Sequence, residues 1–400
     1  MNLVLINQFF PPAQAPTGIL LADLADELSR RGHTVTVIAS AAGYGAEAGG
    51  TAGAAPGVHV VRVGPAQRHR SGLAAKARDY LGFYRCAWRA LQGLPERPDV
   101  LVFMTTPPFI GLIGAHLRKR RGIPYVLWSM DLYPEALAAH GVLRDWNPLK
   151  PLLRGLARIE RGRAACVVAL GPDMAARLDA SGASRVETVP VWSSLSATPD
   201  AQTSARALRR ARGWADDDIV LLYSGNMGRA HRAEEFAALA EHLRGQAPRC
   251  RFVFAGDGPQ RAGWERRWGG VFEFGPAVPG EAVVAHLLAA DVHLVSQQPE
   301  WLGVVVPSKF QAACALGRPT VFAGPPQSSI GGWLSEADAG WLLPPGDAAA
   351  IGMAAEGILD APLRAERGAK AARLFERRFS KSANGGRLAE LVESAAKENP

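Results

Sequence analysis

Glycines and positive charges follow an apolar run in the second half of the chain, in a pattern suited to binding a phosphate. Gly225 and Asn226 come directly after residues 219–224, which read as a strand, and Arg229 and Arg232 stand in the same loop. Glycines expose backbone amides, and amides beside guanidinium groups form a favourable site for an anion such as a diphosphate. Two readings stay open for the arginines: they bind the anion, or they are solvated charges at the start of a helix.

A lysine in a second loop adds to this predicted site. Lys309 ends the sequence Val-Pro-Ser-Lys, in which Ser308 precedes it. A fixed ammonium group stabilises a leaving diphosphate without a metal ion, because it offsets the negative charge that develops. We therefore predict Lys309 as a catalytic and phosphate-binding residue, with Ser308 beside it.

Two carboxylates in the first half suit the handling of a hydroxyl group. Asp131 and Glu135 follow the apolar run 125–128. Parallel α/β sheets present their ligand-binding groups beyond the carboxyl ends of the strands, and a carboxylate there can orient a hydroxyl or accept its proton. Asp131 and Glu135 are predicted as catalytic residues that position an acceptor. The alternative is that both cap a helix around Pro134.

Strand-like runs alternate with helical patterns along the chain, which predicts an α/β fold with doubly wound parallel sheets. The expected strands of the first set lie at residues 3–6, 34–39, 58–63, 100–104, 125–128 and 166–170, and a second set begins at residues 219–224. The loop at residues 7–18 argues against a dinucleotide site, because it carries prolines where the G-x-G-x-x-G fingerprint requires glycines. Gly18, at the start of a helix, either contacts an anion or is a simple turn residue.

The chain is expected to divide at residues 193–205, which are rich in Ser, Thr, Ala and Asp and read as a linker. One domain is expected at residues 1–192 and a second at residues 206–375. The helical pattern near the end of the chain is interrupted at Phe379, so residues 376–400 are expected to hold a separate last helix.

Composition and charge restrict the class of protein. The chain of 400 residues is 48% apolar, enough for real cores, and its net charge is +8. A basic chain favours anionic partners: nucleic acid, an anionic membrane surface or phosphorylated small molecules. The four cysteines lie far apart without metal-type spacing, which predicts ordinary thiols in a reducing compartment and no metal site. With no signal peptide and no apolar run of about 18 residues, we expect the protein in the cytoplasm.

A basic and aromatic segment bears on the partner. Between residues 67 and 91, apolar side chains recur at near-helical spacing among Arg68, Arg70, Lys76, Arg78, Arg85 and Arg89. Such a helix can lie on the anionic inner face of the cytoplasmic membrane, with the basic run 118–121 adding charge. Equally, its apolar stripe can pack on the sheet. No RNA or DNA module is recognised, so no nucleic-acid partner is expected.

Several motifs together resemble a known family. The segments Phe252–Pro259, Phe274-Gly275-Pro276, Val306–Lys309 and Gly317-Arg318-Pro319, together with Asp131-Leu132-Tyr133-Pro134-Glu135, are similar in order and spacing to those of retaining family 4 glycosyltransferases, which have the GT-B fold. The resemblance implies two Rossmann-like domains that face an interdomain cleft. The first domain would bind the acceptor and the second the nucleotide-sugar donor, and residues 376–400 would return to the first domain.

The resemblance also implies roles for individual residues. Gly18 would contact the donor phosphate, and Gly275 and Val278 would lie against the nucleotide base. The donor diphosphate would be bound by Gly225, Asn226, Arg229, Arg232, Ser308 and Lys309. Neither a cofactor nor a metal is expected, because these cations supply the positive charge.

One departure from the family concerns the donor sugar. Many members hold sugar hydroxyls with two glutamates eight positions apart, and alignment on the Gly-Arg-Pro motif puts Val304 and Ala312 there. The branch that often lacks the pair includes N-acetylfucosamine-type transferases of O-antigen, capsule and colanic-acid-type assembly. The resemblance implies a hexosyltransferase that retains anomeric configuration and acts on a polyprenyl-diphosphate-linked acceptor. Two alternatives remain, a nonhydrolysing nucleotide-sugar 2-epimerase and a nucleotide-sugar-binding scaffold without activity.

Overall fold

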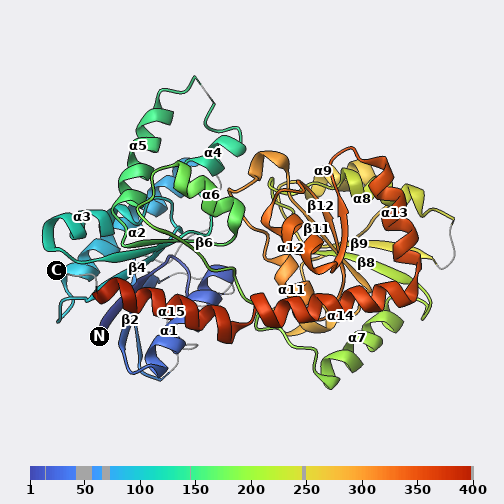
Figure 1. Ribbon diagram of the computed structural model, residues 1–400, viewed down its shortest axis with the longest axis horizontal. Coiled ribbons are helices and arrows are strands. Elements are labelled where there is room, and N and C mark those ends of the chain that lie inside the picture. The colour runs from blue at the N-terminus through green and yellow to red at the C-terminus, as the bar shows by residue number, and fades with distance from the viewer. Residues whose placement is uncertain (14, 42–55, 65–72, 145, 246–248, 398–400) are drawn as a thin grey trace. The chain divides into compact units, whose positions relative to one another are not determined.

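The computed structural model contains two compact units (Figure 1). It describes the chain except for residues 14, 42–55, 65–72, 145, 246–248 and 398–400 and the side chains of residues 73, 74 and 76. Unit 1 comprises Met1–Pro190 and Lys381–Pro400, and unit 2 comprises Val191–Ser380. The chain therefore leaves unit 1, completes unit 2 and returns to unit 1 for its last helix.

Unit 1 is a parallel sheet of seven strands in the order β3-β2-β1-β4-β5-β6-β7. The strands are β1 (Asn2–Ile6), β2 (Thr34–Ser40), β3 (Val58–Val63), β4 (Val100–Met104), β5 (Tyr125–Trp128), β6 (Cys166–Ala169) and β7 (Val186–Thr188). The central strand β1 is apolar from Leu3 to Ile6, and all four side chains are fully buried. A strand covered on both faces by helices needs this continuous apolar run.

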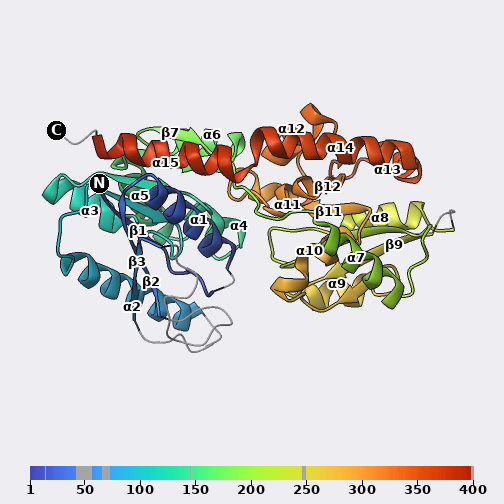
Figure 2. The same cartoon turned by 90° about the horizontal axis from the view of Figure 1, so that it is seen from below.

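The helices of unit 1 are α1 (Pro16–Arg30), α2 (Leu73–Gln92), α3 (Leu112–Arg121), α4 (Glu135–Ala139), α5 (Leu149–Gly162), α6 (Pro172–Ala180) and α15 (Lys381–Lys397). Figure 2 shows α15 alongside α1. The contacts of α15 with α1 and the residue after it include Lys381 Nζ, which lies 2.6 Å from Asp23 Oδ1, and Arg31 Nη1, which lies 3.4 Å from Glu393 Oε2. The last helix thus completes unit 1.

Unit 2 is a parallel sheet of six strands in the order β10-β9-β8-β11-β12-β13. Its strands are β8 (Ile219–Ser224), β9 (Cys250–Ala255), β10 (Glu273–Gly275), β11 (Val292–Ser296), β12 (Thr320–Ala323) and β13 (Gly340–Leu343). Its helices are α7 (Pro199–Ala211), α8 (Glu234–His242), α9 (Arg261–Trp268), α10 (Val283–Leu288), α11 (Lys309–Ala315), α12 (Ser329–Ala337), α13 (Ala348–Leu359) and α14 (Ala361–Arg378), with short 3-10 turns at Gly280–Ala282 and Pro299–Trp301. Aromatic side chains fill its core, where the rings of Phe254 and Phe272 stack with centroids 4.2 Å apart.

Both sheets follow the strand order of a Rossmann fold, which confirms the predicted fold class. In such sheets the order reverses beside the first strand, and ligands bind beyond the carboxyl ends of the strands at that switch point. The switch point lies between β1 and β4 in unit 1 and between β8 and β11 in unit 2.

The predicted linker at residues 193–205 is wrong in its second half, which forms the first turns of α7. The Thr198 side chain accepts a hydrogen bond from Ala201 N over 3.2 Å, and Pro199 stands at the first helical position. A Ser/Thr- and Pro-containing stretch reads as a linker by composition, but the same residues make a helix N-terminus. The break between α14 and α15 falls at residues 379–380, so residues 376–378 belong to α14 rather than to the last helix. No described helix is long and apolar enough to cross a membrane.

Candidate functional site

Two glycine-containing loops meet beyond the carboxyl ends of β8 and β9. Gly225 N donates a hydrogen bond to Ala255 O over 2.8 Å, and Met227 N donates to Asp257 O over 2.7 Å. Gly256 has a φ of 140°, and a Cβ atom there would lie 2.0 Å from Gly225 O. Only glycine fits such a position. The two loops are therefore in backbone contact beside the switch point of unit 2, which the loop after β8 borders.

Lys309 lies against this pair of loops. Its Nζ atom is 3.3 Å from His231 Nε2, 3.5 Å from Asn226 O and 5.0 Å from the centre of the Tyr223 ring. Gly225 leaves room for the lysine stem, because a Cβ atom at that glycine would lie 3.2 Å from Lys309 Cε. The fold thus brings together Gly225, Asn226 and Lys309, three of the residues predicted to bind the donor.

The lysine is directed by a histidine. His231 is buried, and its Nδ1 lies 2.7 Å from Ser296 O, at the end of β11. A carbonyl oxygen only accepts, so Nδ1 carries the proton and Nε2 is left to accept a hydrogen bond from the Lys309 ammonium group. Burial, together with the Lys309 charge, lowers the pKa of His231 to about 3. The imidazole is therefore neutral and acts as an acceptor.

Lys309 carries a charge that is costly to bury. Burial lowers its pKa from 10.5 to about 8. Among the residues that the structure describes, no carboxylate forms an ion pair with Lys309. A half-buried ammonium group that has only neutral partners favours an anionic ligand, which would offset the desolvation of the charge.

The two predicted arginines differ in their surroundings. Arg232 Nε lies 2.6 Å from Glu235 Oε2, and the bidentate pair is largely buried at the start of α8. Glu235 thus offsets the charge of Arg232, and the pair stabilises the start of α8. Arg229 is exposed in the loop after Gly228.

The other predicted donor residues of unit 2 are Gly275, Val278 and Ser308. Gly275 ends β10, and its carbonyl accepts hydrogen bonds from Gly256 N over 3.2 Å and from Arg261 Nη1 over 2.5 Å. Val278 follows three residues later and packs on an apolar cluster of unit 2 that includes Leu316. Ser308 immediately precedes α11, with an exposed side chain.

The two positions that depart from the family pattern are apolar contacts. Val304 is buried, and Ala312 packs on the apolar cluster that includes Leu316. Neither side chain can hold a sugar hydroxyl.

In unit 1, Gly18 allows a close backbone approach. It lies in the first turn of α1, and a Cβ atom there would be 3.1 Å from Phe10 N and 3.2 Å from Phe9 C. Residues 9 and 10 belong to the loop after β1. A side chain at position 18 would push this loop away from the helix.

Asp131 lies just beyond the carboxyl end of β5. Thr105 Oγ1 accepts hydrogen bonds from Met130 N over 3.0 Å and from Asp131 N over 3.1 Å, which ties this turn to the end of β4. Burial raises the pKa of Asp131 from 3.8 to about 6. Burial raises the pKa of Tyr80 and Tyr133, and the Asp131 charge adds to both shifts. Asp131 is thus a half-buried carboxyl group beside two phenols.

Glu135 has a structural partner. Its two carboxylate oxygens lie 2.9 and 2.8 Å from the guanidinium nitrogens of Arg161, which also donate to Tyr133 O and to Ser181 Oγ. Although burial raises the pKa of Glu135, hydrogen bonding to Arg161 brings it below its ordinary value. Glu135 is therefore held in an ion pair with Arg161, and no side-chain hydrogen bond caps α4. Among the residues that the structure describes, none forms an ion pair with Asp131.

The structure describes only part of the basic segment at residues 67–91. Arg68 and Arg70 and the Lys76 side chain lie outside the described residues. Over the described part of α2, Phe83, Ala87 and Leu91 are buried. These three residues pack inside unit 1, whereas Ala77 and Leu81 on the same helix are exposed. Arg121, in the run 118–121, donates to Gln92 at the end of α2 over 2.6 Å.

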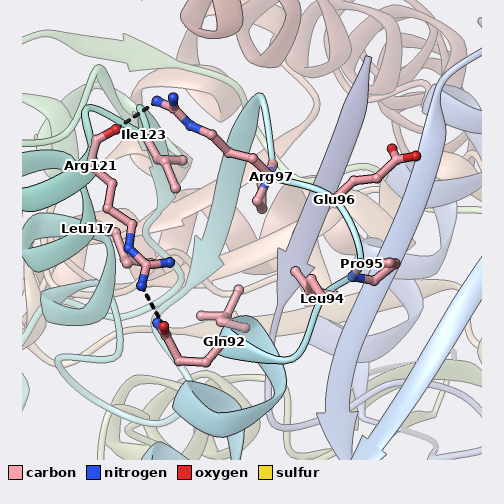
Figure 3. A pocket seen from close by; sticks show the side chains of 10 residues that line it. Gln92, Leu94, Pro95, Glu96, Arg97, Leu117, Arg121 and Ile123 are labelled. Carbon is pink, nitrogen blue, oxygen red and sulfur yellow. Dashed lines mark hydrogen bonds between the residues drawn. The ribbon is translucent and has the colours of Figure 1, made fainter.

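Two hollows lie away from the switch points. One, of about 410 Å³, is lined by Gln92, Leu94, Arg97, Arg121 and other residues that precede β4 or end α3 (Figure 3). The other, of about 530 Å³, is lined by residues that include Asp291 and Arg318, just before β11 and β12. Both open at the amino ends of strands, whereas ligands of such sheets bind at the carboxyl ends.

The sequence had not identified the roles of His231 and Tyr223. Neither residue was among the predicted site residues, and Tyr223 was only part of the expected strand at residues 219–224. A tyrosine at the end of a predicted strand, one residue before Ser224 and the glycine loop, was the available signal. No group of three or more His, Cys, Asp and Glu residues that could hold a metal ion occurs in the described part of the chain.

Two protein-family models match the chain. The model described as "Glycosyl transferase 4-like domain" matches residues 18–192, and that described as "Glycosyl transferases group 1" matches residues 218–361. The first match lies in unit 1 apart from its last two residues, and the second lies within unit 2.

The chain also matches two curated proteins at low sequence identity. The chain is 24% identical over 263 residues to the probable glycosyltransferase WbjE of Pseudomonas aeruginosa, which covers 64% of this chain and 65% of WbjE. It is 28% identical over 145 residues to the putative colanic acid biosynthesis glycosyl transferase WcaI of Escherichia coli K12, which covers 36% of each protein. The matched regions thus span less than two thirds of either relative.

Solved structures share the fold. Sucrose-phosphate synthase from Thermosynechococcus elongatus superimposes with a TM-score of 0.75 at 16% identity, covering 98% of both chains. Anabaena HepE in complex with UDP-glucose gives a TM-score of 0.68 at 16% identity, covering 98% of this chain and all of that one. At this identity the likeness establishes the fold alone.

Proposed function

The chain belongs to the family 4 glycosyltransferases of the GT-B fold, and on this basis we propose that it transfers a hexose from a nucleotide diphosphate sugar to a hydroxyl group of a lipid-linked saccharide. Unit 2 binds the donor and unit 1 binds the acceptor. The solved structure of HepE holds UDP-glucose, which supports a nucleotide sugar as the donor.

The observation that carries the proposal is the Lys309 ammonium group, half-buried among neutral partners at the switch point of unit 2. His231 directs it, and the contacting loops at Gly225 and Gly256 form the floor beside it. The leaving nucleotide diphosphate gains negative charge as the bond to the sugar breaks. A preorganised cation at that point stabilises the transition state.

Two features of the reaction belong to this proposal. The enzyme works without a metal ion, because Lys309 and Arg229 supply the positive charge that a metal would otherwise bring. Anomeric configuration is retained, with the donor phosphate taking the proton of the acceptor hydroxyl on the same face of the sugar. Asp131 orients that hydroxyl, since its raised pKa leaves it ionised above about pH 6.

A polyprenyl-diphosphate-linked saccharide is the acceptor that we propose, within the synthesis of a cell-envelope polysaccharide. The name of WcaI places that relative in colanic acid biosynthesis. An acceptor of this kind resides in a membrane, so we propose that the protein works at the cytoplasmic face of the membrane.

The test is nucleotide release by the purified protein from a panel of UDP-, GDP- and dTDP-sugars, with and without polyprenyl-diphosphate-linked acceptors and with products identified by mass spectrometry. A glycosylated lipid is the expected product. Lys309→Ala should lower kcat/KM by roughly 100- to 1,000-fold, as for loss of one charge-stabilising donor. Lys370→Ala serves as the control, because that lysine pairs with Asp338 and Glu366 on the surface of unit 2.

The apolar side chains of Val304 and Ala312 favour one second candidate, a nucleotide-sugar-binding scaffold without activity. Donor binding without nucleotide release across the whole acceptor panel would support the scaffold and contradict the transferase. Conversion of the donor into its 2-epimer without any acceptor, with the sugar still joined to the nucleotide in the product, would instead point to an epimerase.

A further inference from the structure

Four aromatic side chains lie close together beyond the carboxyl ends of β4 and β5 in unit 1. Phe109 follows β4 and Tyr133 follows β5, and the centroids of their rings lie 6.3 Å apart. Helix α2 contributes Tyr80 and Tyr84, which stand four residues apart and therefore on the same face of the helix. All four side chains are half-buried. We refer to these four residues as the aromatic cluster.

Asp131 lies beside the aromatic cluster. Burial raises the pKa of Tyr80 and of Tyr133, and the charge of Asp131 raises both further. Burial also raises the pKa of Tyr84, and nearby groups that include Glu160 and Tyr133 add to this shift. The cluster thus combines apolar ring surface with a carboxylate and with phenol groups that can donate or accept a hydrogen bond.

Phe109 has a backbone conformation that phenylalanine rarely adopts. Its φ is 63°, in the left-handed region where the Cβ atom of a bulky residue is unfavourable. The turn is held by two hydrogen bonds, from Leu112 N to Phe109 O over 3.1 Å and from Gly111 N to Glu160 Oε1 over 2.8 Å. Residues strained in this way concentrate at binding and catalytic sites. The conformation of Phe109 therefore indicates a binding site at this edge of the sheet.

Helix α5 holds both loops that carry the rings. Glu160 and Arg161 are neighbours on this helix, and both are buried. Glu160 accepts the hydrogen bond from Gly111 in the loop after β4. Arg161 donates to Tyr133 O in the loop after β5 over 2.7 Å. The two loops are thus preorganised, so a ligand that contacts both rings loses little free energy in ordering them.

The charges around the aromatic cluster favour a neutral ligand over an anionic one. Apart from the tyrosines themselves, each described residue whose charge shifts the pKa of these tyrosines is an acid: Asp79, Asp131 or Glu160. The buried cation of α5, Arg161, is already paired with Glu135. Carboxylates repel a diphosphate but accept hydrogen bonds from hydroxyl groups.

We propose that Phe109 and Tyr133 form a subsite for a neutral pyranose ring, the terminal sugar of the acceptor, and that they determine which sugar the protein accepts. A pyranose presents C–H groups on its faces and hydroxyl groups around its rim. The negatively polarised face of an aromatic ring attracts C–H groups, and Asp131 accepts hydrogen bonds from the hydroxyl groups. This assignment rests on the proposed function, because it takes the pyranose to be part of the acceptor. It also assigns the diphosphate of that acceptor to a position outside the cluster.

The experiment is saturation-transfer difference NMR of the full-length protein with a panel of neutral methyl pyranosides, without donor or lipid. The panel holds the methyl glycosides of glucose, galactose, mannose, fucose and N-acetylglucosamine. We expect at least one pyranoside to receive saturation at the ring protons of one face, because one face lies on the aromatic rings. Inorganic pyrophosphate, added as a competitor, should not displace it.

Two variants remove one ring each. Phe109→Gly should keep the fold, because glycine adopts a positive φ without strain, and Tyr133→Ala removes the second ring. Each should weaken pyranoside binding about tenfold, the loss expected for one aromatic contact. Circular dichroism verifies that both variants are folded. Trp146→Ala is the control, because it removes a ring that is 77% exposed ahead of α5 and outside the cluster, and it should bind as the wild type does.

Several outcomes would overturn the proposal. They are absence of saturation for every pyranoside, displacement of the pyranoside by pyrophosphate, wild-type binding by both Phe109→Gly and Tyr133→Ala, and an equal loss in Trp146→Ala. Calorimetric titration with UDP tests the donor site of unit 2 separately, and both cluster variants should keep wild-type affinity for UDP. Nucleotide release without pyranoside binding would overturn the subsite and leave the transferase standing. Pyranoside binding without release from any donor would contradict the transferase instead.

Discussion

Lys309 holds its charge where burial makes that charge costly. The lysine donates to a neutral histidine and lies over the ring of Tyr223, and neither partner carries a negative charge. Its pKa of about 8 is therefore lower than that of a lysine in water. An anion that binds beside it raises this pKa again, because the opposite charge favours the protonated form.

This coupling predicts a pH dependence of donor binding. Below about pH 8 the free protein carries the Lys309 ammonium group, and affinity for UDP should be constant. Above that pH the lysine loses its proton, and affinity should fall by up to about tenfold per pH unit until the pKa of the complex is reached. Calorimetric titration from neutral to alkaline pH measures the effect. A profile that is unchanged in Lys309→Ala would contradict the assignment.

The pKa of Asp131 predicts a change in activity at acidic pH. Its pKa of about 6 means that the carboxylate is ionised above that pH and protonated below it. We expect kcat/KM to fall as the pH drops below about 6, and Asp131→Asn to lose most activity together with this acidic limb.

Substitution of Asp131 should affect the stability of unit 1 in the opposite direction to its effect on activity. Burial raises the pKa of Asp131 above its ordinary value, so the carboxyl group favours folding at low pH, and this contribution is lost as the pH rises through about 6. Asp131→Asn should therefore keep or raise the melting temperature of unit 1 at neutral pH. A fall in melting temperature that parallels the loss of activity would mean that Asp131 is structural.

At the scale of elements, the side chain of Arg161 connects three helices of unit 1. Arg161 in α5 binds Glu135 at the start of α4, and its guanidinium also donates to Ser181 just after α6 over 2.9 Å. Breaking a buried pair leaves the partner carboxylate uncompensated, at a cost of about 3–5 kcal/mol. Arg161→Met should therefore lower the free energy of unfolding of unit 1 by about this amount in urea titration.

The control for this substitution lies on the same helix. Arg158→Met removes an exposed arginine of α5, and its effect should stay within about 0.5 kcal/mol. Equal effects of the two substitutions would show that the pair with Glu135 contributes nothing to stability.

Most helices and strands could be predicted from the sequence, whereas the contacts between residues far apart in the chain could not. The apolar run 58–63 is β3 to the residue, and the break near Phe379 separates α14 from α15. The pair between Arg232 and Glu235 is three residues apart and was visible in principle. The contact of His231 with Lys309 joins residues 78 positions apart, and only the packing of β8 beside β11 brings them together. The roles proposed for the site residues remain predictions.

At the scale of the whole molecule, unit 1 depends on a helix that the chain supplies after unit 2 is complete. Helix α15 buries Leu388, Ala389 and Val392 completely, against α1, β4 and β5. Asn384 Nδ2 also donates to Pro190 O over 2.9 Å, near the point where the chain first leaves unit 1. Removing α15 would expose the surface that these residues cover.

Deletion of residues 381–400 should therefore affect the two units unequally. Loss of the buried leucine and valine alone costs about 4 kcal/mol, which is a large part of the stability of a typical domain. Unit 2 keeps all six of its described strands and the residues around Lys309. We expect calorimetry of the truncated chain to show one transition at much lower temperature and one unchanged, with UDP binding retained. If both transitions fall together, or if UDP binding disappears, the two units do not fold and bind independently.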